Sequence, residues 1–123
     1  MRRWTMTCLA IALVLVAGLA ARARPHTPQT PVSISRQTLF ENAQVRVMRL
    51  KLEPGAMEDP HTHPYDMVVT MLTPGDVVTV TGESTARAHR DTNYTMYIPK
   101  GTRHADGNDG KAPYEVLVVA IVK

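Results

Sequence analysis

Apolar and polar residues alternate over short segments of this chain rather than at helical spacing. Across residues 48–53, the apolar side chains of Met48, Leu50 and Leu52 are separated by charged ones, a period of two that is typical of a strand with one buried face. The run at 115–122 is almost wholly apolar and predicts a strand central to a sheet or buried on both faces. Further runs rich in β-branched and apolar residues span 65–72, 77–81 and 94–98.

Turn-forming residues separate these runs. Proline and glycine end four of them, at Pro54-Gly55, Pro74-Gly75, Gly82-Glu83 and Pro99 with Gly101. A period near 3.6 does not persist anywhere for three helical turns. Short strands at regular spacing, broken by turns, predict an all-β sandwich or barrel.

The first residues follow the order of a secretory signal peptide. Arg2 and Arg3 precede the apolar run Leu9–Leu19, and small residues follow it. The alternative is a membrane anchor, but the apolar stretch is shorter than the roughly 20 residues that a spanning helix needs. We therefore expect residues 1–23 to be a signal peptide, cleaved after Ala20 or Ala23, and the protein to be periplasmic or extracellular.

A proline-rich linker is predicted over residues 24–35. Pro25, Pro28 and Pro31 recur at every third position, which favours an extended tether. The domain itself is then expected at 36–123, and this length is enough for one modest core.

The excess of basic over acidic residues comes from the predicted signal peptide. The net charge of +3 comes from 14 Lys and Arg against 11 Asp and Glu. Cleavage after Ala23 removes three arginines and leaves the two signs equal, so no nucleic-acid partner and no membrane partner is expected. The single cysteine, Cys8, leaves with the same segment, and no disulfide or thiol chemistry is expected in the mature protein.

Two histidines are separated by one residue, at His61 and His63. Side chains at positions i and i+2 of a strand point to the same face, so these imidazoles can converge on one ion. Taken alone, such a pair is more typical of an exposed strand.

Two motifs around the histidines resemble those of the cupin superfamily. Gly55-Ala-Met-Glu-Asp-Pro-His61-Thr-His63 fits G-x(5)-H-x-H, and Pro99-Lys-Gly101-Thr-Arg-His104-Ala-Asp-Gly-Asn108 fits P-x-G-x(2)-H-x(3)-N. The chain is similar to small single-domain monocupins of the cupin-2 type. The resemblance implies an all-β jelly-roll barrel whose ligands His61, His63 and His104 hold one divalent transition metal (iron, zinc, copper, nickel or manganese).

The chain departs from the family pattern at two places. Asn93 stands where the second motif opens with glycine, and Asn tolerates a left-handed backbone. The glutamate expected after a gap of three or four residues beyond the second histidine is replaced by Met67 and Val68. Asp66 is one residue early and is expected to point away from the histidines. The prediction is a three-histidine centre with open coordination positions, or alternatively a degenerate site.

Other residues of the motifs are expected to support the structure. Gly55 and Gly101 are predicted at turns with unusual φ, and Asn108 is predicted to fix a loop through bonds to the backbone. Tyr65 and Tyr97 are candidates to line the barrel, and Tyr65 is a possible hydrogen-bond partner of a metal ligand. His89 is interpreted as a surface or rim residue.

Two functions from different classes fit this sequence. One is a metal-dependent enzyme acting on a small molecule (an oxygenase, isomerase or decarboxylase), with dioxygenase-like chemistry favoured if the protein is an enzyme. The other is a non-catalytic barrel that binds a small ligand or a metal, favoured by the missing glutamate and an expected shortage of inward-pointing acids and bases. A metal-free barrel is ranked last. The resemblance also implies a possible homodimer, because small cupins often pair their exposed sheets.

Overall fold

The computed structural model describes residues 32–123 of the 123-residue chain. Within this range the chain forms nine strands and no helix, so it contains no helical segment able to cross a membrane. The predicted signal peptide and most of the predicted linker lie outside the described residues. The all-β prediction is confirmed.

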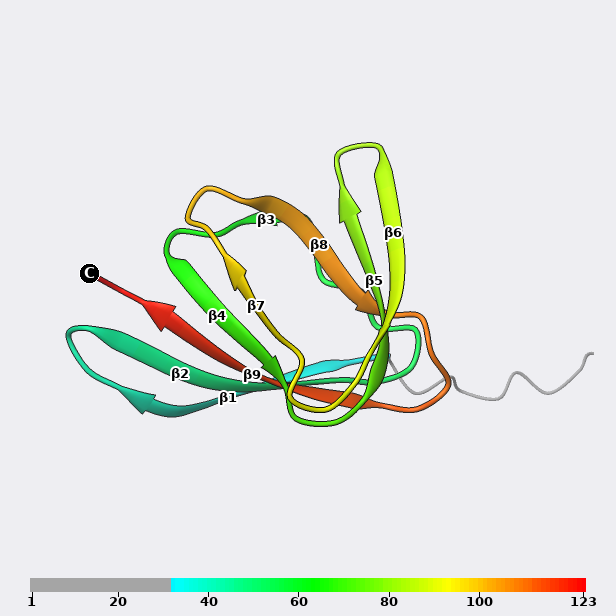
Figure 1. Ribbon diagram of the computed structural model, residues 1–123, viewed down its shortest axis with the longest axis horizontal. Helices are drawn as coiled ribbons and strands as arrows, with labels where there is room; N and C mark the ends of the chain where they lie inside the picture. The colour runs from blue at the N-terminus through cyan, green and yellow to red at the C-terminus, as the bar shows by residue number, and fades with distance from the viewer. Residues whose placement is uncertain (1–31) are drawn as a thin grey trace, which may run out of the picture.

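The strands form two antiparallel sheets that face one another (Figure 1). The five-stranded sheet has the order β1 (Ile34–Glu41), β2 (Val45–Leu52), β9 (Tyr114–Ile121), β4 (Asp66–Met71) and β7 (Thr95–Ile98). The four-stranded sheet has the order β3 (His61–Thr62), β8 (Arg103–Asn108), β5 (Gly75–Thr81) and β6 (Ser84–Arg90). Apart from the hairpins β1–β2 and β5–β6, neighbouring strands are far apart in the chain, so the fold depends on long-range pairing.

The five apolar runs of the sequence correspond to β2, β4, β5, β7 and β9. As predicted, β9 lies at the centre of its sheet, between β2 and β4. Strands β1 and β6 were not predicted, because most of their residues are exposed and no buried face marks them. The first strand begins at Ile34, inside the range predicted as linker.

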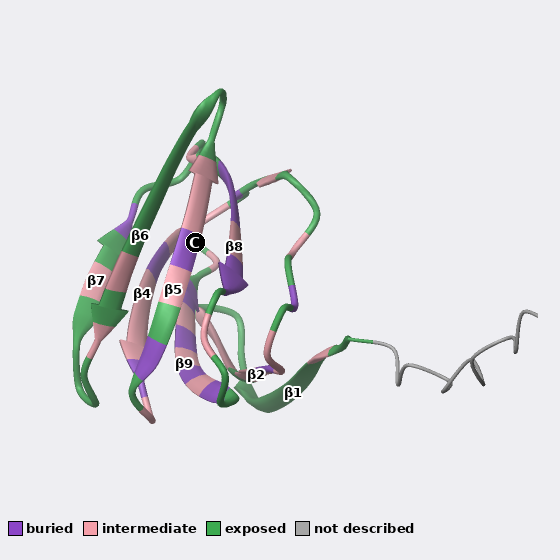
Figure 2. Cartoon of the chain, turned by 90° about the vertical axis from the view of Figure 1, so that its right-hand side faces the viewer, coloured by how far each residue is buried: buried purple, intermediate pink, exposed green. Residues whose placement is uncertain are grey.

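The core lies between the sheets, on the inward face of the five-stranded one. Along β9, alternate residues are buried from Tyr114 to Ala120 and those between them are half-buried, which is visible as banding in Figure 2. Leu52 of β2 and Met67 and Met71 of β4 join this cluster. Burial of these apolar side chains is the main source of stability.

Turns with positive φ occur where the motifs predicted them. Gly55 and Gly101 have φ of 80° and 85°, and Asn93 has φ of 68°. Asn93 therefore occupies a left-handed position that glycine fills in the family pattern, and its short polar side chain makes this tolerable.

Asn108 fixes the connection from β8 to β9, as predicted. Its side chain is 2% exposed. Its Nδ2 donates to the carbonyl oxygens of Leu52 (2.9 Å) and Ala112 (2.8 Å), and its Oδ1 accepts from the backbone N–H of Gly110 (2.9 Å). One buried amide thus joins the end of β2 to the loop that leads into the central strand.

We expect Asn108→Ala to lower the free energy of unfolding by about 1–3 kcal/mol, because it leaves buried backbone groups without partners. Urea unfolding of the purified domain measures this change. The control is Asn93→Gly, which also removes an amide but keeps the positive φ, and it is expected to change stability by less than about 0.5 kcal/mol. Equal losses in the two variants would contradict the assigned role.

Candidate metal centre

Adjacent segments of the four-stranded sheet carry the three motif histidines. His61 is the first residue of β3 and lies directly opposite His104 of β8 in the antiparallel register. His63 follows β3, where its N–H donates to the Thr102 carbonyl (2.9 Å) and its carbonyl accepts from the N–H of Gly101 (2.9 Å). These bonds continue the pairing of the two segments and hold His63 on the same face as His61.

The three imidazoles converge, as the sequence predicted. Each offers one ring nitrogen, and these nitrogens lie within 4.8 Å of one another. The ring centroids are 4.7 Å apart for His61 and His63, 5.2 Å for His61 and His104, and 4.7 Å for His63 and His104. No other group of three potential ligands this close occurs within residues 32–123.

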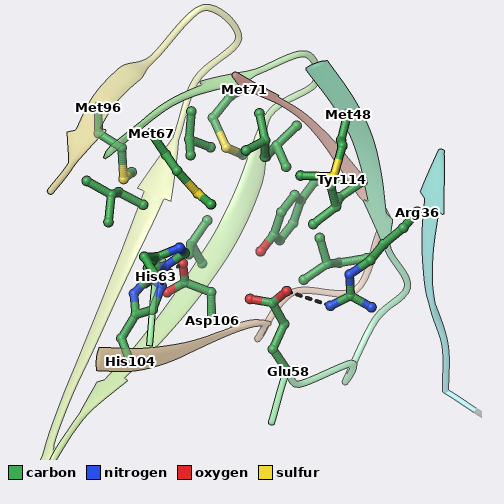
Figure 3. Close-up of a pocket in the computed structure, with 17 residues that line it drawn as sticks. Arg36, Met48, Glu58, His63, Met67, Met71, Met96, His104, Asp106 and Tyr114 are labelled. Carbon is green, nitrogen blue, oxygen red and sulfur yellow. Dashed lines mark hydrogen bonds and ion pairs between the residues drawn. The ribbon is translucent and has the colours of Figure 1, made fainter. Parts of the chain in front are cut away.

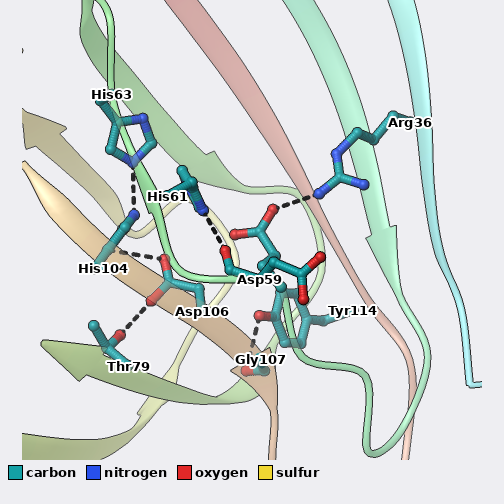
Figure 4. Close-up of polar contacts among 10 residues, drawn as sticks. Arg36, Asp59, His61, His63, Thr79, His104, Asp106, Gly107 and Tyr114 are labelled. Carbon is teal, nitrogen blue, oxygen red and sulfur yellow. Dashed lines mark hydrogen bonds and ion pairs between the residues drawn. The ribbon is translucent and has the colours of Figure 1, made fainter. Parts of the chain in front are cut away.

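The backbone sets the tautomer of His61. Its Nδ1 lies 2.9 Å from the carbonyl oxygen of Asp59 (Figure 4). A carbonyl can only accept, so Nδ1 carries the hydrogen of this bond. The neutral ring then presents an unprotonated Nε2, the form in which imidazole binds metals.

Burial favours the neutral form of His63. Only 7% of this residue is exposed, and burial lowers the pKa of its imidazole, with further lowering from the neighbouring His104 and His61. A metal ligand must be deprotonated, so a depressed pKa suits this role. The donor set of three convergent and mostly buried imidazoles therefore fits a transition-metal ion.

A carboxylate is not part of this cluster. The Oδ1 of Asp66 accepts from the backbone N–H of Lys100 (2.8 Å), and this bond and one from Tyr97 hold the pKa of the Asp66 carboxyl below its usual value. Asp66 thus points away from the histidines, as predicted. Its neighbour Met67 is buried and points inward.

The histidine cluster borders a cavity of about 170 Å³ between the sheets (Figure 3). His63 and His104 both line it, whereas His61 does not. The other lining residues are mostly apolar: Met48, Leu50, Leu52, Met67, Val69, Met71, Val77, Met96, Ile98, Val116 and Val118.

Four polar residues that the sequence analysis did not single out also line this cavity. They are Arg36, Glu58, Asp106 and Tyr114. The expected shortage of inward-pointing acids is therefore wrong, since Glu58 and Asp106 both face the interior. For Asp106 a signal existed, because it is two residues beyond His104 on one strand and shares its face. Glu58 lies in an irregular loop, where no periodicity indicates direction.

Each of these polar groups already has a partner. The carboxylate of Glu58 is 2.7 Å from Nη2 of Arg36, and the Tyr114 hydroxyl donates to the Gly107 carbonyl (3.1 Å). Burial, together with the negative charges of Asp106 and Glu58, raises the pKa of Tyr114. The phenol therefore stays protonated at any ordinary pH.

The remaining candidates lie elsewhere. Tyr97 is 59% exposed and hydrogen-bonds to Asp66, so the expectation that it lines the barrel is wrong. It lies on the outer face of β7, because the inward positions there are Met96 and Ile98. Tyr65 packs against the core but does not line the cavity, and its role toward a metal ligand stays a prediction. His89 is an exposed residue of β6 paired with Asp76 (2.8 Å).

Comparisons with known proteins identify the fold. No family model matches the chain, and no curated protein matches it. A cupin domain from Bordetella pertussis has a TM-score of 0.67 and 22% identity, over 72% of this chain and 92% of that one. A cupin superfamily protein from Desulfitobacterium hafniense has a TM-score of 0.61 and 13% identity, over 74% and 79%. The polyketide cyclase RemF from Streptomyces resistomycificus has a TM-score of 0.63 and 16% identity, over 73% and 66%.

The chain therefore has the cupin fold, as its two motifs predicted. At these identities the likeness shows the architecture, and function must be argued from the site itself.

We expect His61→Ala and His104→Ala each to retain less than about a tenth of the metal that the wild-type protein binds, because two ligands cannot replace three. Elemental analysis after loading with Zn²⁺ or Fe²⁺ and gel filtration measures this. His89→Ala is the control and should bind metal like the wild type. Full metal content in His104→Ala would contradict the site.

Proposed function

We propose that this protein is a mononuclear metalloprotein that binds one small organic molecule in its cavity and acts on it. His61, His63 and His104 would hold the metal. The observation that carries the proposal is the position of His63 and His104, which belong both to the ligand cluster and to the cavity wall. A molecule in the cavity would lie against the metal.

The residues present suit catalysis by an ion with open coordination positions. Three protein ligands without a carboxylate leave room for exogenous ligands, which is the arrangement of catalytic rather than structural sites. A bound ion would supply Lewis-acid or redox chemistry. The chain itself fixes the ring of His61 through Asp59, keeps His63 neutral by burial, and surrounds the site with apolar side chains that exclude water.

The size and lining of the cavity indicate the class of ligand. A cavity of about 150 Å³ is enough to hold a benzene molecule, and the one here is about 170 Å³. Its apolar wall suits a hydrocarbon or aromatic body, while the carboxylates of Glu58 and Asp106 are hydrogen-bond acceptors. We infer a small molecule that carries hydroxyl or other donor groups on an apolar frame. An oxygenase reaction is the first candidate, because open positions can take both substrate and dioxygen.

A non-catalytic binding barrel is the second candidate, and one observation favours it. The inward-facing polar groups are already engaged, Glu58 by Arg36, Tyr114 by Gly107 and Asp106 by Thr79. None of them is an unpaired base. The structural neighbours do not distinguish an enzyme from a binding barrel, since one is described as a polyketide cyclase and others only as cupin proteins.

We expect the Fe²⁺-loaded protein to consume dioxygen in the presence of at least one member of a panel of catechols, flavonols and thiols. Val118→Phe fills the cavity from β9 and should reduce this rate by about tenfold or more without loss of metal. Val119→Phe, on the opposite face of the same strand, is the matched control and should leave the rate unchanged. Inactivity with bound metal, together with ligand binding that Val118→Phe abolishes, would support the binding barrel instead.

We also propose that the protein is exported, on the basis of the basic, apolar and small-residue order within residues 1–23. Expression of the full chain in a Gram-negative bacterium should place it in the periplasm or medium, with a mature N-terminus after Ala20 or Ala23. Cell fractionation and N-terminal sequencing measure this. Substitution of Leu13 and Leu15 by Arg should retain the uncleaved chain in the cytoplasm. Cytoplasmic wild-type protein with an intact N-terminus would contradict export.

A further inference from the structure

Asp106 is half-buried beside His104 and is held from the neighbouring strand. It lies directly opposite Thr79 in the pairing of β5 with β8. The Thr79 hydroxyl donates to Asp106 Oδ1 at 2.5 Å (Figure 4). Because a hydroxyl bond this short to a carboxylate is a strong contact, the orientation of Asp106 is well defined.

The second carboxylate oxygen faces a metal-ligand candidate. Oδ2 of Asp106 lies 3.7 Å from Nδ1 of His104, and both side chains are shielded from solvent, at 25% and 8% exposed. This separation is longer than a hydrogen bond, but a negative charge so close favours the tautomer that has its N–H on Nδ1. The lone pair of His104 is then on Nε2.

The other nitrogen of His104 faces His63. The two Nε2 atoms are 2.6 Å apart, so one ring donates and the other accepts. With the hydrogen of His104 on Nδ1, its Nε2 must be the acceptor and Nε2 of His63 the donor. The donor and acceptor of each hydrogen bond are thus assigned. Thr79 donates to Asp106, and Nε2 of His63 donates to Nε2 of His104.

We propose that Asp106 is a positioning residue that holds His104 in the tautomer able to bind metal through Nε2. The inference rests on the proposed metal site and deepens it. It makes Asp106 the electrostatic counterpart of the Asp59 carbonyl, which fixes His61 through a hydrogen bond. The tautomers of two of the three ligands are then set by an oxygen beside Nδ1, and such partners orient a ligand and raise its basicity.

His63 is the ligand that changes on metal binding. In the metal-free protein its hydrogen is on Nε2, bonded to His104, and that nitrogen must lose the hydrogen before it can bind an ion. Solvent can take the Nε2 proton and return one to Nδ1, so the ring stays neutral and no net proton is released. Metal uptake therefore includes one tautomer exchange, at His63 alone.

The test combines imidazole ¹⁵N chemical shifts of the metal-free protein with Zn²⁺ affinity from competition titration. The wild type should show Nδ1–H for His104 and Nε2–H for His63. Asp106→Asn should shift His104 toward Nε2–H and weaken Zn²⁺ binding by about 10- to 100-fold. Thr79→Val, which releases the carboxylate without removing it, should change both readouts in the same direction to a smaller extent.

Asp109→Asn is the matched control, since its carboxylate pairs with Arg87 at the surface. It should change neither the tautomers nor the affinity. An Nε2–H tautomer of His104 in the wild type, or unchanged tautomers and affinity in both Asp106→Asn and Thr79→Val, would overturn the proposal. If Asp106→Asn does not fold, Thr79→Val still decides it. Failure of the wild type to bind any metal would reject the proposed function, whereas the metal-free spectra would still decide the tautomer of His104.

Discussion

The register of β8 is the constraint on which the rest of this structure depends. This strand pairs with β3 on one side and β5 on the other, and its alternate residues His104, Asp106 and Asn108 share the inward face. A slip by one residue would turn all three outward. The metal-ligand candidate, the carboxylate behind it and the amide that anchors the loop to β9 are therefore fixed by the same set of backbone hydrogen bonds.

The two sheets make different contributions to the cavity. The five-stranded sheet supplies most of its apolar wall, from β2, β4, β7 and β9. Most of its polar groups come from the four-stranded sheet and the loop before it, with Arg36 and Tyr114 as the exceptions. Because the two kinds of surface face each other, the proposed ligand would have one favourable orientation, with its donor groups toward the carboxylates of Glu58 and Asp106.

The sequence predicted the parts of the fold in which chemistry and periodicity agree. The strands with one buried face, the shared face of His61 and His63 and the role of Asn108 were predicted from the residues themselves. That His104 joins the two histidines was predicted from the resemblance to the cupin motifs. Strand β1 was not, because its residues are exposed along nearly the whole strand and burial leaves no pattern there. Glu58 points inward because of the path of an irregular loop and its ion pair with Arg36. Both depend on the tertiary structure, so no local pattern in the sequence indicates them.

Four of the seven methionines of the chain, Met48, Met67, Met71 and Met96, line the cavity. Thioether side chains are unbranched and adaptable, so this wall can reshape around molecules of different outline. The same sulfurs are easily oxidised, and a sulfoxide is polar where the thioether was not. If dioxygen is reduced beside them, oxidation of these methionines would make the apolar wall of the cavity polar. The number of turnovers that one protein molecule completes would then be limited by damage to its own cavity.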